Sequence, residues 1–235
     1  MKNNETILGF IPARSGSKSI PDKNIRKLAG KEMLGYTIEA AQESKVCDRL
    51  IVSTDSEKIA KVARKYNADV PFLRPEHLAT DSAQMMDVIK HGMHWIEEND
   101  QKYDIFLYLQ PTSPLRKGRH IREALDIFFK KNAYSVVSVN KTGYIPGRVN
   151  TLPENSYMNE FVEEAKVHQN RQDLQSYYEL NGAVELIRWD VMKKNWNWYG
   201  DHSYPYVIPA PYGLDIDNMM DFRFAQFLIK EGYVK

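Results

Sequence analysis

A basic segment near the start of the sequence is the strongest candidate for chemistry. Residues 14–27 contain one anion, Asp22, and five cations, which are Arg14, Lys18, Lys23, Arg26 and Lys27. Gly16 and the serines around it allow the backbone to approach a ligand closely, and successive backbone N–H groups can face an anion. The segment therefore favours a bound polyphosphate. The competing interpretation is a solvated loop with ordinary surface cations.

Two common phosphate-binding motifs do not match this segment. A Walker-type loop requires a glycine directly before its lysine, whereas Ser17 precedes Lys18. The dinucleotide fingerprint G-x-G-x-x-G is also absent from the sequence. A polyphosphate would therefore be held by a different arrangement of small and basic residues.

A pair of carboxylates near the end of the sequence is the candidate metal site. Asp215 and Asp217 are separated by one residue, and residues i and i+2 of an extended segment point to the same side. Mg²⁺ prefers carboxylate, water and phosphate oxygens, so the pair suits an ion that accompanies a triphosphate. The competing interpretation is a solvated pair, or a cap in which Asp217 begins the last helix at Asn218.

Apolar runs that alternate with helical patterns must position these groups. The runs predict buried strands, at 7–11, 49–54, 105–109, 135–139, 182–187 and 206–208. Apolar residues at helical spacing fall between the first four runs, and a last helix is predicted around 222–229. This alternation indicates βαβ units and a mostly parallel α/β sheet, in which ligands bind beyond the carboxyl ends of the strands.

Size and charge limit the classes to which the chain can belong. Its 235 residues are 43% hydrophobic and 27% charged, with a formal charge of +1. This balance argues against a broad basic face for nucleic acid, and no apolar run is long enough to span a membrane. The single cysteine, Cys47, cannot form an internal disulfide. We expect a cytoplasmic protein with a single domain over residues 1–235, interrupted by an irregular excursion at 142–170.

Residues 10–24 resemble the N-terminal signature of the acylneuraminate cytidylyltransferase family, whose members activate nine-carbon acidic sugars as CMP conjugates. Ser19 stands where the family has glycine, but every charged position is kept. Further segments resemble the family's nucleotide-base segment, second signature and sugar-side segment, at 73–83, 109–116, 171–172 and 181–183. The resemblance implies a three-layer Rossmann-like fold of the nucleotidyltransferase type, and a homodimer with a small dimerisation arm at 142–170.

The resemblance also implies roles for individual residues, with CTP and an acidic sugar as substrates. A catalytic set grips the triphosphate and a Mg²⁺ ion that Asp215 and Asp217 hold: Arg14, Lys18, Lys23, Asp215 and Asp217. A nucleotide-binding set shares the three cations of that set and adds further residues: Ser17, Asn24, Arg74, Ser82 and Ala83. A substrate-binding set faces the sugar: Gln110, Thr112, Arg171, Gln172 and Asn181. The alternative for Arg74 is a surface or helix-capping arginine.

Three functions stay open on the sequence alone. The first is CTP-dependent activation of a nonulosonic acid such as N-acetylneuraminate or legionaminate. The second keeps the chemistry but uses another acidic acceptor or GTP, and the third is nucleotide binding without catalysis. The complete set of cations and carboxylates argues against the third. Glu185, in the predicted strand 182–187, either faces solvent or favours a sugar with an amino or amidino group.

Overall fold

The computed structural model of the chain describes residues 4–145, 149–152, 154, 158 and 175–234. Its centre is a six-stranded sheet in the order β4-β1-β5-β7-β6-β8. The strands are β1 (Ile7–Pro12), β4 (Arg49–Ser53), β5 (Ile105–Tyr108), β6 (Ser135–Thr142), β7 (Tyr177–Arg188) and β8 (Ser203–Val207). β1 pairs in parallel with β4 and β5, and β6 with β8, whereas β7 is antiparallel to both neighbours. The predicted mostly parallel sheet is confirmed.

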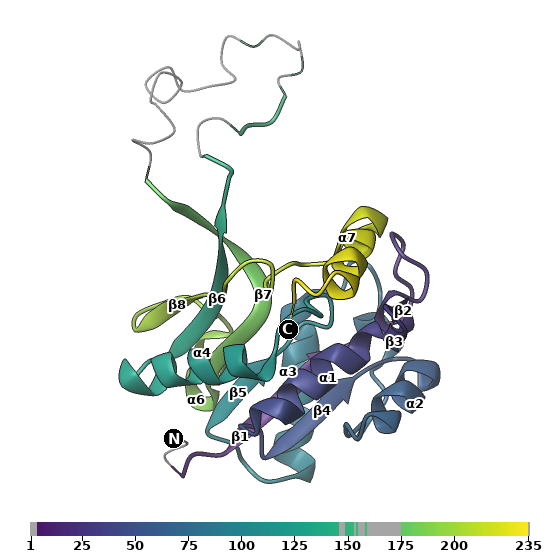
Figure 1. Cartoon of the computed structure of the whole chain (residues 1–235). Helices are drawn as coiled ribbons and strands as arrows, with labels where there is room; N and C mark the ends of the chain where they lie inside the picture. Colours follow the sequence, from purple (N-terminus) through teal and green to yellow (C-terminus); the bar gives the residue numbers. More distant parts are fainter. Residues whose placement is uncertain (1–3, 146–148, 153, 155–157, 159–174, 235) are drawn as a thin grey trace.

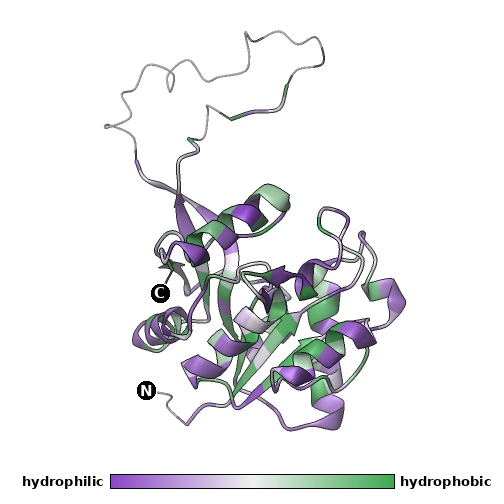
Figure 2. Ribbon diagram, turned by 45° about the vertical axis from the view of Figure 1, so that its right-hand side comes forward, coloured by the Kyte–Doolittle hydropathy of each residue, from purple (hydrophilic) through white to green (hydrophobic). Residues whose placement is uncertain are grey.

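Helices cover both faces of the sheet and complete the predicted three layers (Figure 1). One apolar core lies under α1 (Met33–Ser44), α2 (Glu57–Lys65) and α4 (Gly118–Lys130). A second core lies under α3 (Met85–Asn99) and α6 (Trp189–Asn195). Figure 2 shows the hydrophobic residues gathered in the central strands, with hydrophilic residues on the outer sides of the helices. Burial of these apolar stripes is the main force that holds helix to sheet.

A third apolar cluster joins the two ends of the chain. α7 (Met219–Lys230) buries Phe222 against Ile20 and Leu28, beside the short hairpin of β2 (Lys27–Leu28) and β3 (Lys31–Glu32). Ile216 belongs to the same cluster and is fully buried. Because Ile216 stands between the two candidate metal ligands, this packing fixes their segment beside the basic segment.

Some elements extend beyond the sequence prediction. β6 and β7 continue to Thr142 and from Tyr177 because their outer ends pair with each other, although Tyr178 and Leu180 are exposed and give no burial pattern. The sequence does not predict the hairpin β2–β3 or the helix α6, because each is too short to show a periodic pattern of hydrophobic residues. Most of the excursion at 142–170 lies outside the described residues. In the part of the chain that is described, no helix is long and apolar enough to cross a membrane.

Candidate active site

A cavity of ≈ 440 Å³ opens at the carboxyl ends of β1 and β5. Segments far apart in the sequence line it: Pro12, Arg14, Ser17, Lys18, Ser19, Lys23, Asn24, Arg74, Met85, Tyr108, Gln110, Pro111, Thr112, Asp215 and Asp217. Three of the five cations in the basic segment and both candidate metal ligands therefore surround one space. It lies where parallel α/β sheets bind their ligands.

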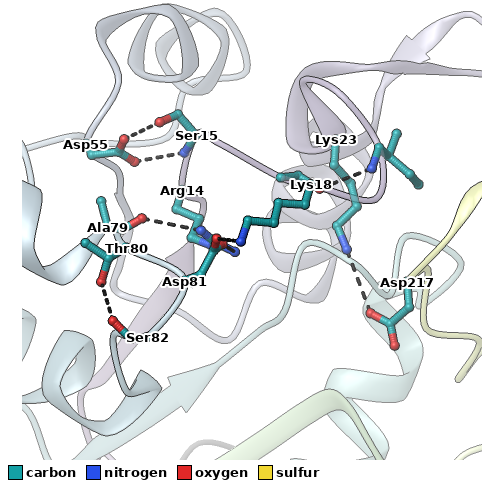
Figure 3. A network of polar contacts seen from close by, with 12 residues as sticks. Arg14, Ser15, Lys18, Lys23, Asp55, Ala79, Thr80, Asp81, Ser82 and Asp217 are labelled. Atoms are coloured by element: carbon teal, nitrogen blue, oxygen red, sulfur yellow. Dashed lines mark hydrogen bonds and ion pairs between the residues drawn. The ribbon is translucent and has the colours of Figure 1, made fainter.

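Hydrogen bonds at both ends hold the first part of the basic segment in place. Asp55, which follows β4, accepts from the Ser15 backbone N–H at 2.9 Å and from the Ser15 hydroxyl (Figure 3). Asn24 Nδ2 donates to the Arg14 carbonyl at 2.9 Å. The other amide oxygen, Asn24 Oδ1, is buried without a hydrogen-bond partner. The cavity wall thus contains an acceptor that a ligand hydroxyl or amine can satisfy.

Asp81 neutralises two of the cavity's cations. Arg14 Nη2 lies 2.8 Å from Asp81 Oδ1, and Lys18 Nζ lies 2.6 Å from Asp81 Oδ2 (Figure 3). Hydrogen bonds from Lys18 and then Arg14 hold the pKa of the Asp81 carboxyl below its usual value. The two cations thus converge on one carboxylate, and two cations placed in this way can also bind another oxyanion.

Replacing Asp81 with asparagine is expected to tighten the binding of CTP, the nucleotide that the resemblance implies, by about two- to fivefold. The substitution releases Arg14 and Lys18 for phosphate, and an exposed ion pair of this kind costs little to lose. Titration calorimetry with CTP measures the change. Asp87→Asn is the matched control, since Asp87 pairs with Lys90 at 3.4 Å on the surface of α3. Unchanged or weaker affinity in the Asp81 variant would contradict this competition.

Lys23 links the basic segment to the carboxylates. Its Nζ donates to the Ile216 carbonyl at 2.9 Å. The same Nζ lies 3.8 Å from Asp217 Oδ1, as Figure 3 shows. The Lys23 side chain is only 14% exposed, so it is a fixed charge at the cavity wall. An ammonium group has three donors, and the remaining ones can meet a phosphate.

The two carboxylates of the candidate metal site line the same cavity but differ in environment. Burial raises the pKa of Asp215, and the charge of Asp217 adds to that effect. Asp215 Oδ1 is buried without a partner, whereas the Asp217 side chain is 77% exposed. The alternative in which Asp217 caps the last helix is wrong. Asn218 is the cap, because its side chain accepts from the backbone N–H groups of the next turn.

Arg74 lies on the cavity wall but uses most of its donors within the protein. It is 4% exposed, and it donates through Nη2 to the Ser53 carbonyl at 2.6 Å and through Nε to the Ser53 hydroxyl at 3.2 Å. Burial lowers the pKa of Arg74 to about 10. The alternative of a surface arginine is wrong, and Nη1, with a long 3.4 Å contact to the Leu78 carbonyl, is the donor best able to meet a base.

Gln110 and Thr112 extend the cavity beyond β5. Thr112 accepts from the Ile216 backbone N–H at 2.8 Å through its carbonyl, which ties this loop to the carboxylate segment. The Gln110 side chain lies over Gly182, where φ is +62° and where an added Cβ would stand 2.3 Å from Gln110 Cδ. Glycine is thus needed both for the left-handed backbone and for the position of Gln110.

Other residues of the predicted site do not line this cavity. Asn181 is buried within the sheet, where Oδ1 accepts from Ser138 Oγ at 2.6 Å and Nδ2 donates to Asn140 Oδ1 at 2.9 Å. The Ala83 N–H donates to the Thr80 carbonyl at 3.3 Å, and Ser82 Oγ contacts Thr80 Oγ1 at 3.2 Å (Figure 3). Two predicted sugar-binding residues, Arg171 and Gln172, lie outside the described residues.

Three residues that shape this region are not among the predicted site residues. Asp55 and Asp81 organise the basic segment through contacts across 40 and 67 positions in sequence. Tyr108, the last residue of β5, is a wall residue that was read only as part of a buried strand. Position in the sequence is the signal for these residues. Asp55 and Tyr108 lie at or next to the carboxyl ends of predicted strands, and Asp81 lies in the segment 73–83 that resembles the family's nucleotide-base segment.

A sequence profile described as cytidylyltransferase matches residues 8–204. The chain is 35% identical over 227 residues to a CMP-N,N'-diacetyllegionaminic acid synthase of Legionella pneumophila, and the match covers 95% of this chain and 96% of that protein. It is 37% identical over 215 residues to an N-acylneuraminate cytidylyltransferase of Streptococcus agalactiae, covering 91% of this chain. The match covers 51% of that relative, so the chain spans about half of its length.

The fold is also similar to that of a solved structure, a CMP:2-keto-3-deoxy-manno-octonic acid synthetase complexed with CTP. The TM-score is 0.69, and the match covers 97% of this chain and 99% of that one. The sequence identity is 15%, so this likeness concerns the fold alone.

Proposed function

The chain belongs to the cytidylyltransferase family of nucleotidyltransferases, and from this premise we propose that it transfers a cytidylyl group from CTP to an acidic nonulosonic sugar of the N-acetylneuraminate or legionaminate type. One observation carries the proposal: three cations of the basic segment, Arg74 and two carboxylates line a single cavity at the carboxyl ends of the strands. A triphosphate with its metal ion requires that combination of charges.

In the proposed reaction, a hydroxyl oxygen of the sugar forms a bond to the α-phosphorus of CTP. The bond from that phosphorus to the oxygen bridging to the β-phosphate breaks, pyrophosphate leaves with the electron pair, and the hydroxyl proton is released. Arg14 and Lys18 would bind the leaving phosphates, and Lys23 would face the α-phosphate. Fixed cations stabilise the developing charge without reorganising, which is usually the largest contribution to catalysis.

Asp215 and Asp217 have the chemistry of a magnesium site. Asp215 Oδ1 is buried without a partner, and both carboxylates border the space beside Lys23. Among the described residues, His, Cys, Asp and Glu form no group of three or more that could hold a metal. Phosphate and water oxygens would complete the coordination. When bound, Mg²⁺ neutralises phosphate charge and polarises the phosphoryl oxygens.

A pyrophosphate-release assay tests the proposal against its alternatives. The purified protein is supplied with Mg²⁺, CTP or GTP, and a panel of acidic sugars. We expect release only when CTP and a nonulosonic acid are both present. Release of pyrophosphate with GTP, or with an acid of another class, would replace the proposed nucleotide or the proposed acceptor. If the protein binds a nucleotide but releases no pyrophosphate with any acceptor, its function is nucleotide binding without catalysis.

Replacing Gly182 with alanine is expected to raise the KM for the sugar about tenfold and to destabilise the fold by about 1 kcal/mol. The stability loss comes from the left-handed backbone, and the KM effect comes from displacement of Gln110 by the new Cβ. Steady-state kinetics and thermal unfolding measure the two effects. Gly232→Ala separates them, since Gly232 has φ +73° but nothing within 4 Å of its added Cβ. An unchanged KM would contradict a role for Gln110 in sugar binding.

We also propose that the chain forms a single nucleotidyltransferase domain and acts in the cytoplasm as a homodimer, with the segment at 142–170 as the dimerisation arm. The ends of β6 and β7 project away from the body of the molecule (Figure 1). Apolar side chains along this part are exposed, including Tyr144 at 69% and Leu152 at 75%. Analytical ultracentrifugation at micromolar concentration tests the assembly, and a monomer would contradict it.

A further inference from the structure

Glu185 is a buried carboxylic acid that the proposed reaction does not use. It lies on β7 in register with Tyr108 of β5 and Val137 of β6, so the three side chains share one face of the sheet. Glu185 is 7% exposed, which makes the alternative of a solvent-facing strand residue wrong. Burial raises the pKa of Glu185 to about 7.

Aromatic residues lie on this side of the sheet near Glu185. The Trp198 ring lies 5.7 Å from the Tyr108 ring between centroids, and Trp198 is 9% exposed. Tyr199 follows and is 51% exposed. Burial raises the pKa of both Tyr108 and Tyr199, and the charge of Glu185 adds to that effect, so both hydroxyls lie within its electrostatic reach. A carboxylate among aromatic faces is the composition of sites that bind organic cations.

Neither Glu185 nor its neighbour Tyr108 is satisfied by the described part of the protein. No described residue forms an ion pair or a hydrogen bond with the Glu185 carboxyl. The Tyr108 hydroxyl is buried without a partner in hydrogen-bonding geometry, although Gln110 is close enough to influence its pKa. A buried hydroxyl is costly when unpaired, and the Glu185 carboxyl beside it makes no bond to a described residue, so one ligand that pairs with both groups would satisfy them.

Tyr108 connects this pair of groups to the reaction site. It lines the cavity together with Gln110 and Thr112, on the side where the sugar is expected. Glu185 is the cross-strand neighbour of Tyr108 in the β5–β7 pair. A substituent of the sugar that extends past Tyr108 would reach the carboxyl group.

We propose that Glu185 and the Tyr108 hydroxyl form a specificity subsite for an amino or amidino substituent of the acceptor sugar. The subsite rests on the proposed function, because it assumes that a nonulosonic acid occupies the cavity. The N–H groups of the substituent would donate to the carboxylate and to the hydroxyl oxygen, and its positive charge would lie among the aromatic rings. A neutral acetamido group has one N–H and no charge, so it gains less.

The test compares two nonulosonic acids that differ only in one acetamidino or acetamido substituent. We expect the wild-type protein to use the acetamidino acid with a kcat/KM at least about tenfold higher, as a hydrogen bond to a charged group allows. Glu185→Gln should bring the two values together while the KM for CTP stays unchanged. Glu98→Gln, at an exposed position near the end of α3, is the matched control. It should keep the wild-type ratio of the two kcat/KM values, acetamidino acid over acetamido acid.

The outcomes separate the subsite from the function on which it rests. A wild-type protein that prefers the acetamido acid or uses both acids equally overturns the subsite, and so does an unchanged ratio in Glu185→Gln. If neither acid yields a CMP conjugate, the proposed function itself is overturned. If Glu185→Gln does not fold, Tyr108→Phe tests the same subsite from the cavity side. That variant should lower the ratio without changing the KM for CTP, and an unaltered ratio overturns the proposal.

Discussion

Replacing Asp215 with asparagine is expected to lower kcat by about 10³-fold or more. Removal of a single preorganised electrostatic group from a polar active site costs about 10²–10³, and a lost metal ligand adds to that. Asp215 is the buried member of the carboxylate pair, and its Oδ1 has no partner in the protein. Pyrophosphate release with CTP and a nonulosonic acid measures the effect. Chelation of Mg²⁺ by EDTA should abolish turnover of the wild-type protein in the same assay.

The stability of this variant distinguishes a metal ligand from a structural residue. A carboxylate with one buried oxygen that has no partner is costly to the fold, so its neutral isostere should not lower the melting temperature. Asp126→Asn, at an exposed position on α4, is the matched control and should retain full activity. Asp217→Asn should be less impaired than the Asp215 variant, because Asp217 is 77% exposed and water can replace its oxygen. Full turnover by Asp215→Asn would contradict the assignment of Asp215 as a metal ligand.

The sequence predicts the framework of the site because the framework depends on local patterns. Continuous apolar runs identify β1, β4 and β5, since strands buried on both faces have no polar alternation. The basic segment and the carboxylate pair follow from charge and spacing, and both line the cavity. The segments after parallel strands meet at one edge of the sheet, so their shared location could also be predicted.

Contacts between distant segments could not be predicted in the same way. The use of Asp81 to neutralise Arg14 and Lys18 depends on how the loop after η2 (Glu76–Leu78) folds over the basic segment. Asn181 looks like a ligand-binding amide in sequence, but a register shift between β6 and β7 turns it into a hydrogen-bonding partner of the sheet. The burial of Glu185 cannot be read from the sequence, because residues 181–187 of its strand are buried on both faces and show no alternation of apolar and polar residues.

Replacing Lys23 with methionine is expected to lower kcat by about 10²–10³-fold, the second largest effect in the site. Methionine keeps most of the volume of the side chain but removes the charge that contacts the Ile216 carbonyl at 2.9 Å and lies 3.8 Å from Asp217. Lys23 also lowers the pKa of Asp215, against the effect of burial. Its loss should therefore move the acid limb of the pH–rate profile to higher pH, because Asp215 then protonates more readily.

Lys27→Met controls for the loss of one cation from the same segment. Lys27 is exposed on β2 and does not line the cavity, so its removal should change neither kcat nor the acid limb. A structural role for Lys23 would lower the melting temperature without moving the pH profile, whereas a role at the reacting phosphate moves both kcat and the profile. If the two variants behave alike, the total charge of the segment matters and the position of Lys23 does not. The fixed geometry of Lys23 argues for position, because a side chain only 14% exposed cannot be replaced by a neighbouring cation without repacking the wall.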